Sequence, residues 1–239
     1  MGKSGVRERM VSFIKYSFKK GLSLGRLDIK MLQVGMLGTN CYIVMDDETK
    51  EGYIIDPGGE ARKVIDTADS LGLKCVGVLC THGHMDHVGA VGKVAEATGA
   101  MVYISKEDSG ALSGSVQGIG AKLGSLVTSK PKSCELISQG DRFEFGGHTL
   151  EVFRTPGHTT GSLSFLCEDN LFCGDLVFQG SIGRTDLRGG SMGELLQSVK
   201  SHVFTLPRNA RIWPGHGPST TVGAEKTSNP FLRSLGGGA

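Results

Sequence analysis

Four side chains of the kinds that bind metal ions lie within six consecutive residues, His82-Gly83-His84-Met85-Asp86-His87. The run directly follows the apolar residues 75–80, whose composition is typical of a buried strand. Imidazole and carboxylate groups are good ligands for zinc and related divalent ions. The sequence therefore predicts a strand that ends near Thr81 and a loop that presents a dense set of metal ligands.

Three later segments carry further ligand-type side chains at turns. His158, Asp175 and His216 each follow a glycine, at points where an apolar run meets glycine or proline. This pattern is typical of a loop at the end of a strand. A single metal ion needs only three or four protein ligands. The five histidines and two aspartates in these four segments therefore favour two ions that share a bridging ligand.

The rest of the sequence limits the other functions that the chain could have. No apolar run approaches the ~18 residues of a membrane span, and the formal net charge of +2 gives no reason to expect a nucleic-acid partner. Residues 1–27 are basic and are predicted to form an extension before one domain, residues 28–239. A helix lying on a membrane surface is the alternative for the extension, although we expect no stable membrane association.

The chain has six cysteines, and no apolar signal segment is apparent before residue 28. A chain of 239 residues can bury a core without disulfides, so we expect reduced thiols in a cytoplasmic protein. Cys167 and Cys173 flank a predicted turn, and a disulfide between them is the alternative. Cys80 is expected to point into the core.

The apolar pattern predicts two successive passes of strands and helices, over about residues 28–104 and about 135–216, as two similar halves. Strands are expected at residues 29–34, 41–45, 53–55, 75–80, 101–104, 136–138, 142–145, 149–154, 162–166, 171–173 and 210–213, and helices at 60–71, at 88–98 and from the capping box 191–194 onward. Over residues 106–133 we expect a short helix and a mobile loop beside the site. Two sheets packed face to face, with helices outside, would fit this α+β pattern.

The motif of residues 81–87, together with Gly157-His158, Gly174-Asp175 and Gly215-His216, resembles the metallo-β-lactamase superfamily in order and spacing. Residues 56–59, 155–162, 180–186 and 229–232 are similar to segments of the glyoxalase II-like hydrolases of that superfamily. The resemblance implies a four-layer αββα sandwich of two mixed sheets, with the metal ions at one edge. It makes residues 28–239 a hydrolase domain.

The resemblance also implies roles for single residues. The first metal ion would be held by His82, His84 and His158, the second by Asp86, His87 and His216, and Asp175 would bridge both. Asp86 would also act catalytically, by orienting a bridging hydroxide for attack on a carbonyl carbon. Asp56 would accept a ring N–H from a ligand histidine or only form a turn. Arg184 would line the substrate entrance or pair with Asp186.

The implied function is hydrolysis of a small-molecule thioester such as S-lactoylglutathione, with two divalent ions as cofactors. Zinc is expected first, with iron or manganese as alternatives, because affinity order alone does not decide occupancy in a cell. The sequence offers no obvious strong general acid, which favours a thioester because its thiolate leaves readily. Only Lys226 and Arg233 are basic after His216, so glutathione recognition is weakly supported. The alternatives are a mononuclear iron persulfide dioxygenase, a lactonase or β-lactamase, and a non-catalytic metal- or RNA-binding protein.

Overall fold

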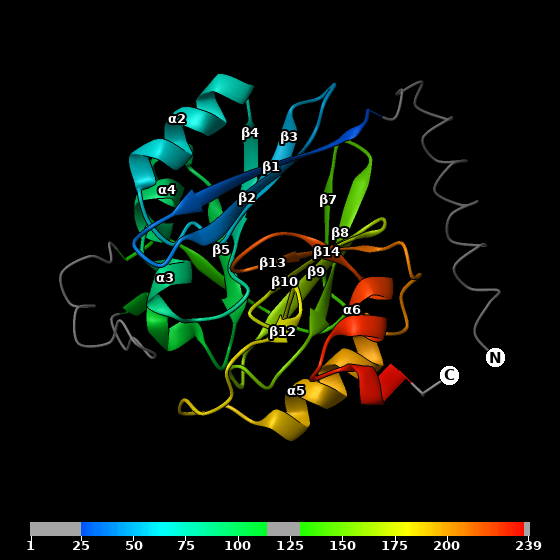
Figure 1. Ribbon diagram of the computed structural model, residues 1–239. Helices are drawn as coiled ribbons and strands as arrows, with labels where there is room; N and C mark the ends of the chain where they lie inside the picture. The colour runs from blue at the N-terminus through cyan, green and yellow to red at the C-terminus, as the bar shows by residue number, and fades with distance from the viewer. Residues whose placement is uncertain (1–24, 114–129, 237–239) are drawn as a thin grey trace.

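Two six-stranded β-sheets pack face to face in this structure, a computed structural model that describes residues 25–113 and 130–236 (Figure 1). In the first sheet the strands follow the chain order, with β1, β2 and β3 antiparallel and β3 to β6 parallel. Its strands are β1 (Leu27–Val34), β2 (Thr39–Asp46), β3 (Glu51–Ile55), β4 (Lys74–Leu79), β5 (Met101–Ser105) and β6 (Cys134–Ile137).

The second sheet has the order β14-β13-β10-β9-β8-β7, and only its β10–β13 pair is parallel. Its strands are β7 (Arg142–Phe145), β8 (His148–Arg154), β9 (Leu163–Cys167), β10 (Asn170–Gly174), β13 (Arg211–Pro214) and β14 (Thr220–Thr221). A small hairpin of β11 (Val177–Phe178) and β12 (Ser181–Ile182) follows β10.

Helices cover the outer faces of both sheets, as Figure 1 shows. The first sheet carries α2 (Ala61–Leu71) and α4 (Val91–Thr98), with the short α3 (Met85–Val88) and the 3-10 turn η1 (Ser109–Ser113) nearby. The second sheet carries α5 (Met192–Ser198), its π-helical continuation η4 (Val199–Val203), α6 (Val222–Ser228) and η5 (Arg233–Gly236). These four layers confirm the predicted αββα sandwich. None of the helices in the described residues is long and apolar enough to cross a membrane.

Alternation along the strands explains the layers. In β2, Ile43 packs into the core under α2 and α4, whereas Tyr42 and Val44 pack into the core between the sheets. In β10, Leu171 and Phe172 divide in the same way between the helix side and the sheet side. Because successive side chains of a strand point to opposite faces, a strand that is apolar throughout must be covered on both sides.

Strand direction places the site. In the first sheet β3 and β4 are parallel, so their carboxyl ends, at Asp56 and the 81–87 loop, share one edge. In the second sheet β8, β10 and β13 run in the same direction, and their carboxyl ends lead to His158, Asp175 and His216. An isolated bridge between Thr39 and His216 joins the two edges. Loops from both sheets therefore meet at one edge of the sandwich.

Some sequence-based expectations were wrong. The strand predicted at residues 136–138 was assigned to the second half, but the observed β6 pairs with β5 and closes the first sheet, with Val102 opposite Cys134. The single helix predicted over residues 88–98 is divided, because the Ala90 N–H donates to the Pro57 carbonyl instead of continuing the helix. The β11–β12 hairpin, β14 and α6 were not predicted.

The six cysteines are all free thiols, as predicted, and Cys80 is buried. Cys167 lies opposite Asn170 and faces the core between the sheets, whereas Cys173 faces the helix side. The alternative of a disulfide between these two was therefore wrong. Residues 1–24 of the basic extension, and residues 114–129 of the segment predicted as a helix and loop, lie outside the described residues.

Candidate metal centre

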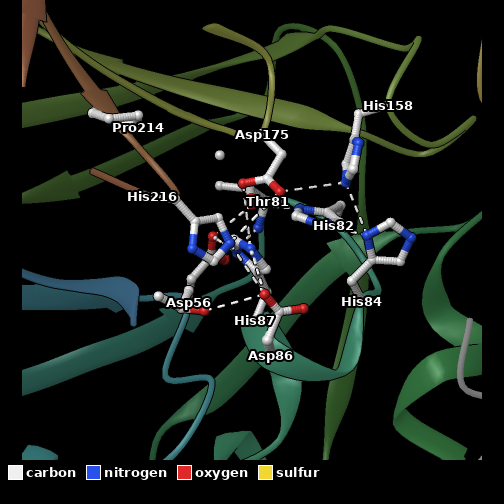
Figure 2. Close-up of polar contacts among 12 residues, drawn as sticks. Asp56, Thr81, His82, His84, Asp86, His87, His158, Asp175, Pro214 and His216 are labelled. Carbon is white, nitrogen blue, oxygen red and sulfur yellow. Dashed lines mark hydrogen bonds and ion pairs between the residues drawn. The ribbon is translucent and has the colours of Figure 1, made fainter. Parts of the chain in front are cut away.

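All seven predicted ligands come together at the edge where the two sheets meet (Figure 2). Six of them form two of the three groups that, among the described residues, could each hold a metal ion. The first ligand group is His82, His84 and His158, and the second ligand group is Asp86, His87 and His216.

Three imidazoles of the first ligand group converge through their ring nitrogens. The Nδ1 atom of His84 lies 3.1 Å from Nε2 of His82 and 2.8 Å from Nε2 of His158. The planes of His84 and His158 are perpendicular, at 90°, as expected for rings that point at a common centre rather than stack. All three side chains are buried. The donor set suits a tetrahedral ion with one further ligand.

The second ligand group is arranged around one carboxylate oxygen. The Oδ2 atom of Asp86 lies 3.1 Å from Nε2 of His216 and 3.6 Å from Nε2 of His87. The Asp86 and His216 side chains are 24% and 27% exposed, whereas His87 is fully buried. This group is therefore the side of the centre that opens toward solvent.

Asp175 lies between the groups and faces both. Its Oδ2 atom is 3.5 Å from Nε2 of His158, and its Oδ1 atom is 3.4 Å from Nε2 of His87. Among the described residues, this Oδ1 and this Nε2 are buried without a hydrogen-bond partner. Unpaired buried polar atoms are costly, and a shared metal ion is a chemically suitable partner for both. The residues present therefore fit a binuclear centre.

Asp56 fixes the hydrogens of two ligand imidazoles. Its Oδ2 atom accepts the Nδ1–H of His87 at 2.8 Å and the hydroxyl hydrogen of Thr81. Because the Thr81 hydroxyl hydrogen goes to the carboxylate, the Thr81 oxygen must accept the Nδ1–H of His82, 3.0 Å away. Both imidazoles then present the lone pair of Nε2 to the centre. These contacts put the Asp56 carboxylate where it can accept the ring N–H of His87, which is one of the two roles expected for it.

His158 is oriented by a backbone carbonyl. Its Nδ1–H donates to the carbonyl oxygen of Arg184 at 2.8 Å, which leaves Nε2 facing His84 and Asp175. The Arg184 side chain instead pairs with Asp186, through contacts of 2.7 and 2.8 Å, at an exposed position. The expectation that these two side chains pair is confirmed.

The buried environment sets the charges of these groups. Burial, with the neighbouring imidazoles, lowers the pKa of His82 well below its usual range and lowers the pKa of His84 to about 4. Burial opposes ionisation of Asp86, but the hydrogen bond with His216 and the nearby imidazoles outweigh it and lower the pKa. Burial also opposes protonation of His87, yet the Asp175 and Asp56 carboxylates raise its pKa. Without metal, His82 and His84 are therefore neutral at pH 7 and ready to coordinate.

Sequence reasoning missed the start of β2, which supports the second ligand group. The Thr39 hydroxyl donates to Oδ2 of Asp86 at 3.2 Å. The Asn40 amide donates to the carbonyls of Pro214 and Gly217, at 2.9 and 2.8 Å, on either side of His216. The Asn40 backbone N–H donates to Gly215 at 2.7 Å. The only local signal was a pair of polar residues before an apolar strand.

The two remaining histidines lie away from the centre, as expected. His148 is buried and contacts Asp46 and Glu168 at the opposite end of the sandwich. His202 stacks on Phe153 on the helix side of the second sheet.

Comparisons with known proteins agree with this geometry. A family model described as the metallo-beta-lactamase superfamily matches residues 34–223. The hydroxyacylglutathione hydrolase GloC of Haemophilus influenzae is 35% identical over 212 residues, which cover 87% of this chain and 99% of that protein. The crystal structure of the BLEG-1 B3 metallo-beta-lactamase is similar with a TM-score of 0.78 and 37% identity, covering 86% of this chain and 99% of that one.

The crystal structure of TTHA1623 in a di-iron-bound form is similar with a TM-score of 0.75 and 36% identity, covering 85% of this chain and 100% of that one. The family model extends over all the segments that carry the two ligand groups. The chain therefore belongs to the metallo-beta-lactamase superfamily.

Proposed function

We propose that this protein is a binuclear metal-dependent hydrolase that cleaves a small-molecule thioester. The observation that carries the proposal is the position of Asp175, whose two carboxylate oxygens face one imidazole of each ligand group at 3.4 and 3.5 Å. One carboxylate can bridge two ions only in such a position, and a pair of ions is the arrangement that binuclear hydrolases use.

When bound, two divalent ions would lower the pKa of water and stabilise negative charge on a substrate carbonyl oxygen. The chain's own residues provide the positioning. Asp86 is held by the Thr39 hydroxyl and lies on the open side of the centre, where its carboxylate can accept a hydrogen bond from attacking water. Asp56 and Thr81 keep the Nε2 lone pairs of His82 and His87 aimed inward.

A thioester is favoured over an amide because the described residues place no strong general acid at the centre beside the candidate ligands. Among the titratable groups at the centre, each imidazole and carboxylate already has a place in a ligand group or supports one. A thiolate leaves without protonation, whereas an amine needs a proton in the transition state. The likeness to the hydroxyacylglutathione hydrolase GloC supports the same substrate class.

The test combines metal content with turnover. Protein purified without chelator is analysed for zinc, iron and manganese per chain, and is assayed with S-lactoylglutathione and with acyl-thioesters of other thiols. About two ions per chain with thioester hydrolysis would support the proposal. Two bound ions without turnover on any thioester would contradict it. The Arg184→Ala variant, assayed in parallel, shows whether that exposed side chain contacts substrate, by a raised KM at unchanged kcat.

Two other reactions are tested with the same preparation. The likeness to a B3 metallo-beta-lactamase makes β-lactam hydrolysis a second candidate, and a chromogenic β-lactam or a lactone distinguishes it. One iron per chain, with oxygen uptake in the presence of a persulfide, would indicate the dioxygenase alternative instead. The di-iron form of TTHA1623 keeps iron beside zinc as a candidate metal. A cytoplasmic location remains part of the proposal.

A further inference from the structure

We propose that Asp108 is a positioning residue that holds together the two loops carrying the first ligand group. A single oxygen, Oδ2, accepts the backbone N–H of Gly83 at 2.9 Å and the hydroxyl hydrogen of Thr159 at 2.7 Å. Gly83 lies between two ligands of the first group, and Thr159 directly follows the third. The inference rests on the proposed function only in taking that group as a metal site.

The loops come from different sheets, so their relative position is not set by either sheet alone. They are joined at their base, where the Leu163 N–H donates to the carbonyl of Thr81 at 2.7 Å. Asp108 joins them again at Gly83 and Thr159, which are the chain neighbours of His84 and His158. The Nδ1 atom of His84 and the Nε2 atom of His158, on the far side of this second link from the base, lie 2.8 Å apart. Removing the second link would let the two imidazoles separate.

The residues around Asp108 leave room for its side chain close to both loops. Its side chain is buried, and its backbone N–H donates to the hydroxyl of Ser105 at 3.3 Å. A Cβ atom on Gly161 would lie 2.6 Å from Cγ of Asp108, and one on Gly83 would lie 3.0 Å from its carbonyl oxygen. Glycines on both sides therefore allow the close approach that the two hydrogen bonds require.

The directions of the hydrogen bonds around Thr159 require that Oδ2 of Asp108 is an acceptor. The Thr159 N–H donates to the Ser162 oxygen, 3.1 Å away, and the two hydroxyls lie 2.8 Å apart. The hydroxyl hydrogen of Thr159 points to Asp108, so Ser162 must donate its own hydrogen to Thr159. An asparagine at position 108 can present its carbonyl oxygen at the same place and preserve both bonds. An alanine cannot.

The test measures zinc affinity for one ligand group at a time. In the His216→Ala background, which removes a ligand of the second group, metal-free protein is titrated with zinc against a chromophoric chelator. We expect Asp108→Ala to weaken this site about 10–100-fold, the range typical for partners that support metal ligands. Asp108→Asn should stay within about threefold of the parent, since a preserved acceptor removes most of the effect. In the His158→Ala background, Asp108→Ala should leave the second group's affinity unchanged.

The control is Asp46→Asn, a buried carboxylate that accepts the N–H and hydroxyl of Thr49 at the opposite end of β2 from Thr39. It should leave both affinities unchanged. Unchanged zinc affinity in Asp108→Ala, or equal weakening of both groups, would overturn the inference. If Asp108→Ala does not fold, Thr159→Val removes one of the two bonds, and we expect about 3–10-fold weaker binding; no weakening would overturn it equally.

These outcomes separate the inference from the proposed function. A wild-type protein that binds fewer than two zinc ions would contradict the binuclear hydrolase. A wild-type protein that binds two, with Asp108→Ala indistinguishable from it, would contradict only the role of Asp108.

Discussion

Replacing Asp56 by asparagine, a side chain of nearly the same size, should weaken zinc binding without leaving a cavity in the core. The carboxylate accepts three hydrogens: the Thr81 N–H at 2.7 Å, the Thr81 hydroxyl and the Nδ1–H of His87 at 2.8 Å. A carboxamide has one oxygen and one NH2 group. In either orientation of the amide, the NH2 group faces at least one of these donors.

The larger effect falls on the proton of His87. If the NH2 group replaces Oδ2, it can pair with His87 only when Nδ1 becomes the acceptor and the hydrogen moves to Nε2. The lone pair that faced Asp86 and Asp175 is then lost to the metal. A hydrogen bond to a charged group contributes about 1.5–3 kcal/mol. At about 1.4 kcal/mol per factor of ten, this corresponds to roughly 10–100-fold weaker zinc binding.

The assay is the same competition titration, carried out on metal-free protein with both ligand groups intact. Asp56→Asn should raise the dissociation constant of the second group by about 10–100-fold. Asp46→Asn serves as the matched control, because it also neutralises a buried carboxylate that accepts a threonine N–H and hydroxyl. Zinc affinity within twofold of wild type in Asp56→Asn would show that the tautomer of His87 is not set by Asp56.

The Asp175→Ala variant removes the side chain that faces both ligand groups. We expect more than about 100-fold loss of hydrolysis and fewer than two metal ions per chain. A variant with two metal ions and full activity would contradict the role of Asp175 as a bridging ligand. The hydrogen bond to Glu168, with Asp46 nearby and burial opposing them, raises the pKa of His148. The stabilisation of the folded state by protonated His148 is therefore full below the unfolded pKa of about 6.5 and is lost as the pH rises through the raised folded pKa. The urea unfolding midpoints of the wild type and of His148→Gln should converge over that pH window. A difference that stays constant with pH would refute this prediction. The Gly58→Ala variant would bring a Cβ to 1.4 Å from the Asp86 carbonyl oxygen, whereas the Cβ of Gly193→Ala meets no atom within 4 Å. We expect about 1–3 kcal/mol or more of destabilisation in Gly58→Ala only, measured by urea unfolding. Equal unfolding midpoints for the two variants would contradict the packing argument.

The candidate ligands could be picked out from the sequence because their signals are local. His158 follows proline and glycine at the end of an apolar run, and the structure places it in the loop after β8. Chemical type and turn position are both properties of a few neighbouring residues. The acceptor role of Asp56, before Pro57, was implied by the resemblance, and the structure shows that Asp56 ends the strand beside the one that leads to residues 81–87.

The supporting contacts were not predictable, because they join distant segments. Asp108 reads as one of two adjacent acidic residues, yet it meets Gly83 and Thr159, which lie 25 and 51 positions away. Asn40 reaches the carbonyl of Pro214 across 174 positions. No periodicity or turn signal encodes such pairs. They depend on how the two sheets pack.

The short helices and strands could not be predicted from the sequence, for a related reason. The helix α6 has seven residues, with Gly223 near its start, so its intrinsic helix preference is weak. It forms because Glu225 is buried and accepts hydrogens from the Gly180 backbone, the Thr220 hydroxyl and the Asn229 amide. Tertiary contacts of this kind override local propensity.

The packing of the two sheets and the affinity for metal are coupled through these same contacts. The first ligand group combines a loop of the first sheet with a loop of the second, and Asp108 and the Thr81–Leu163 bond join those loops. Asn40, on the first sheet, holds the chain on both sides of His216, which follows a strand of the second. An ion bound to ligands from both sheets would cross-link them and stabilise the folded state by mass action. A substitution that shifts one sheet against the other should therefore weaken metal binding even where it contacts no ligand.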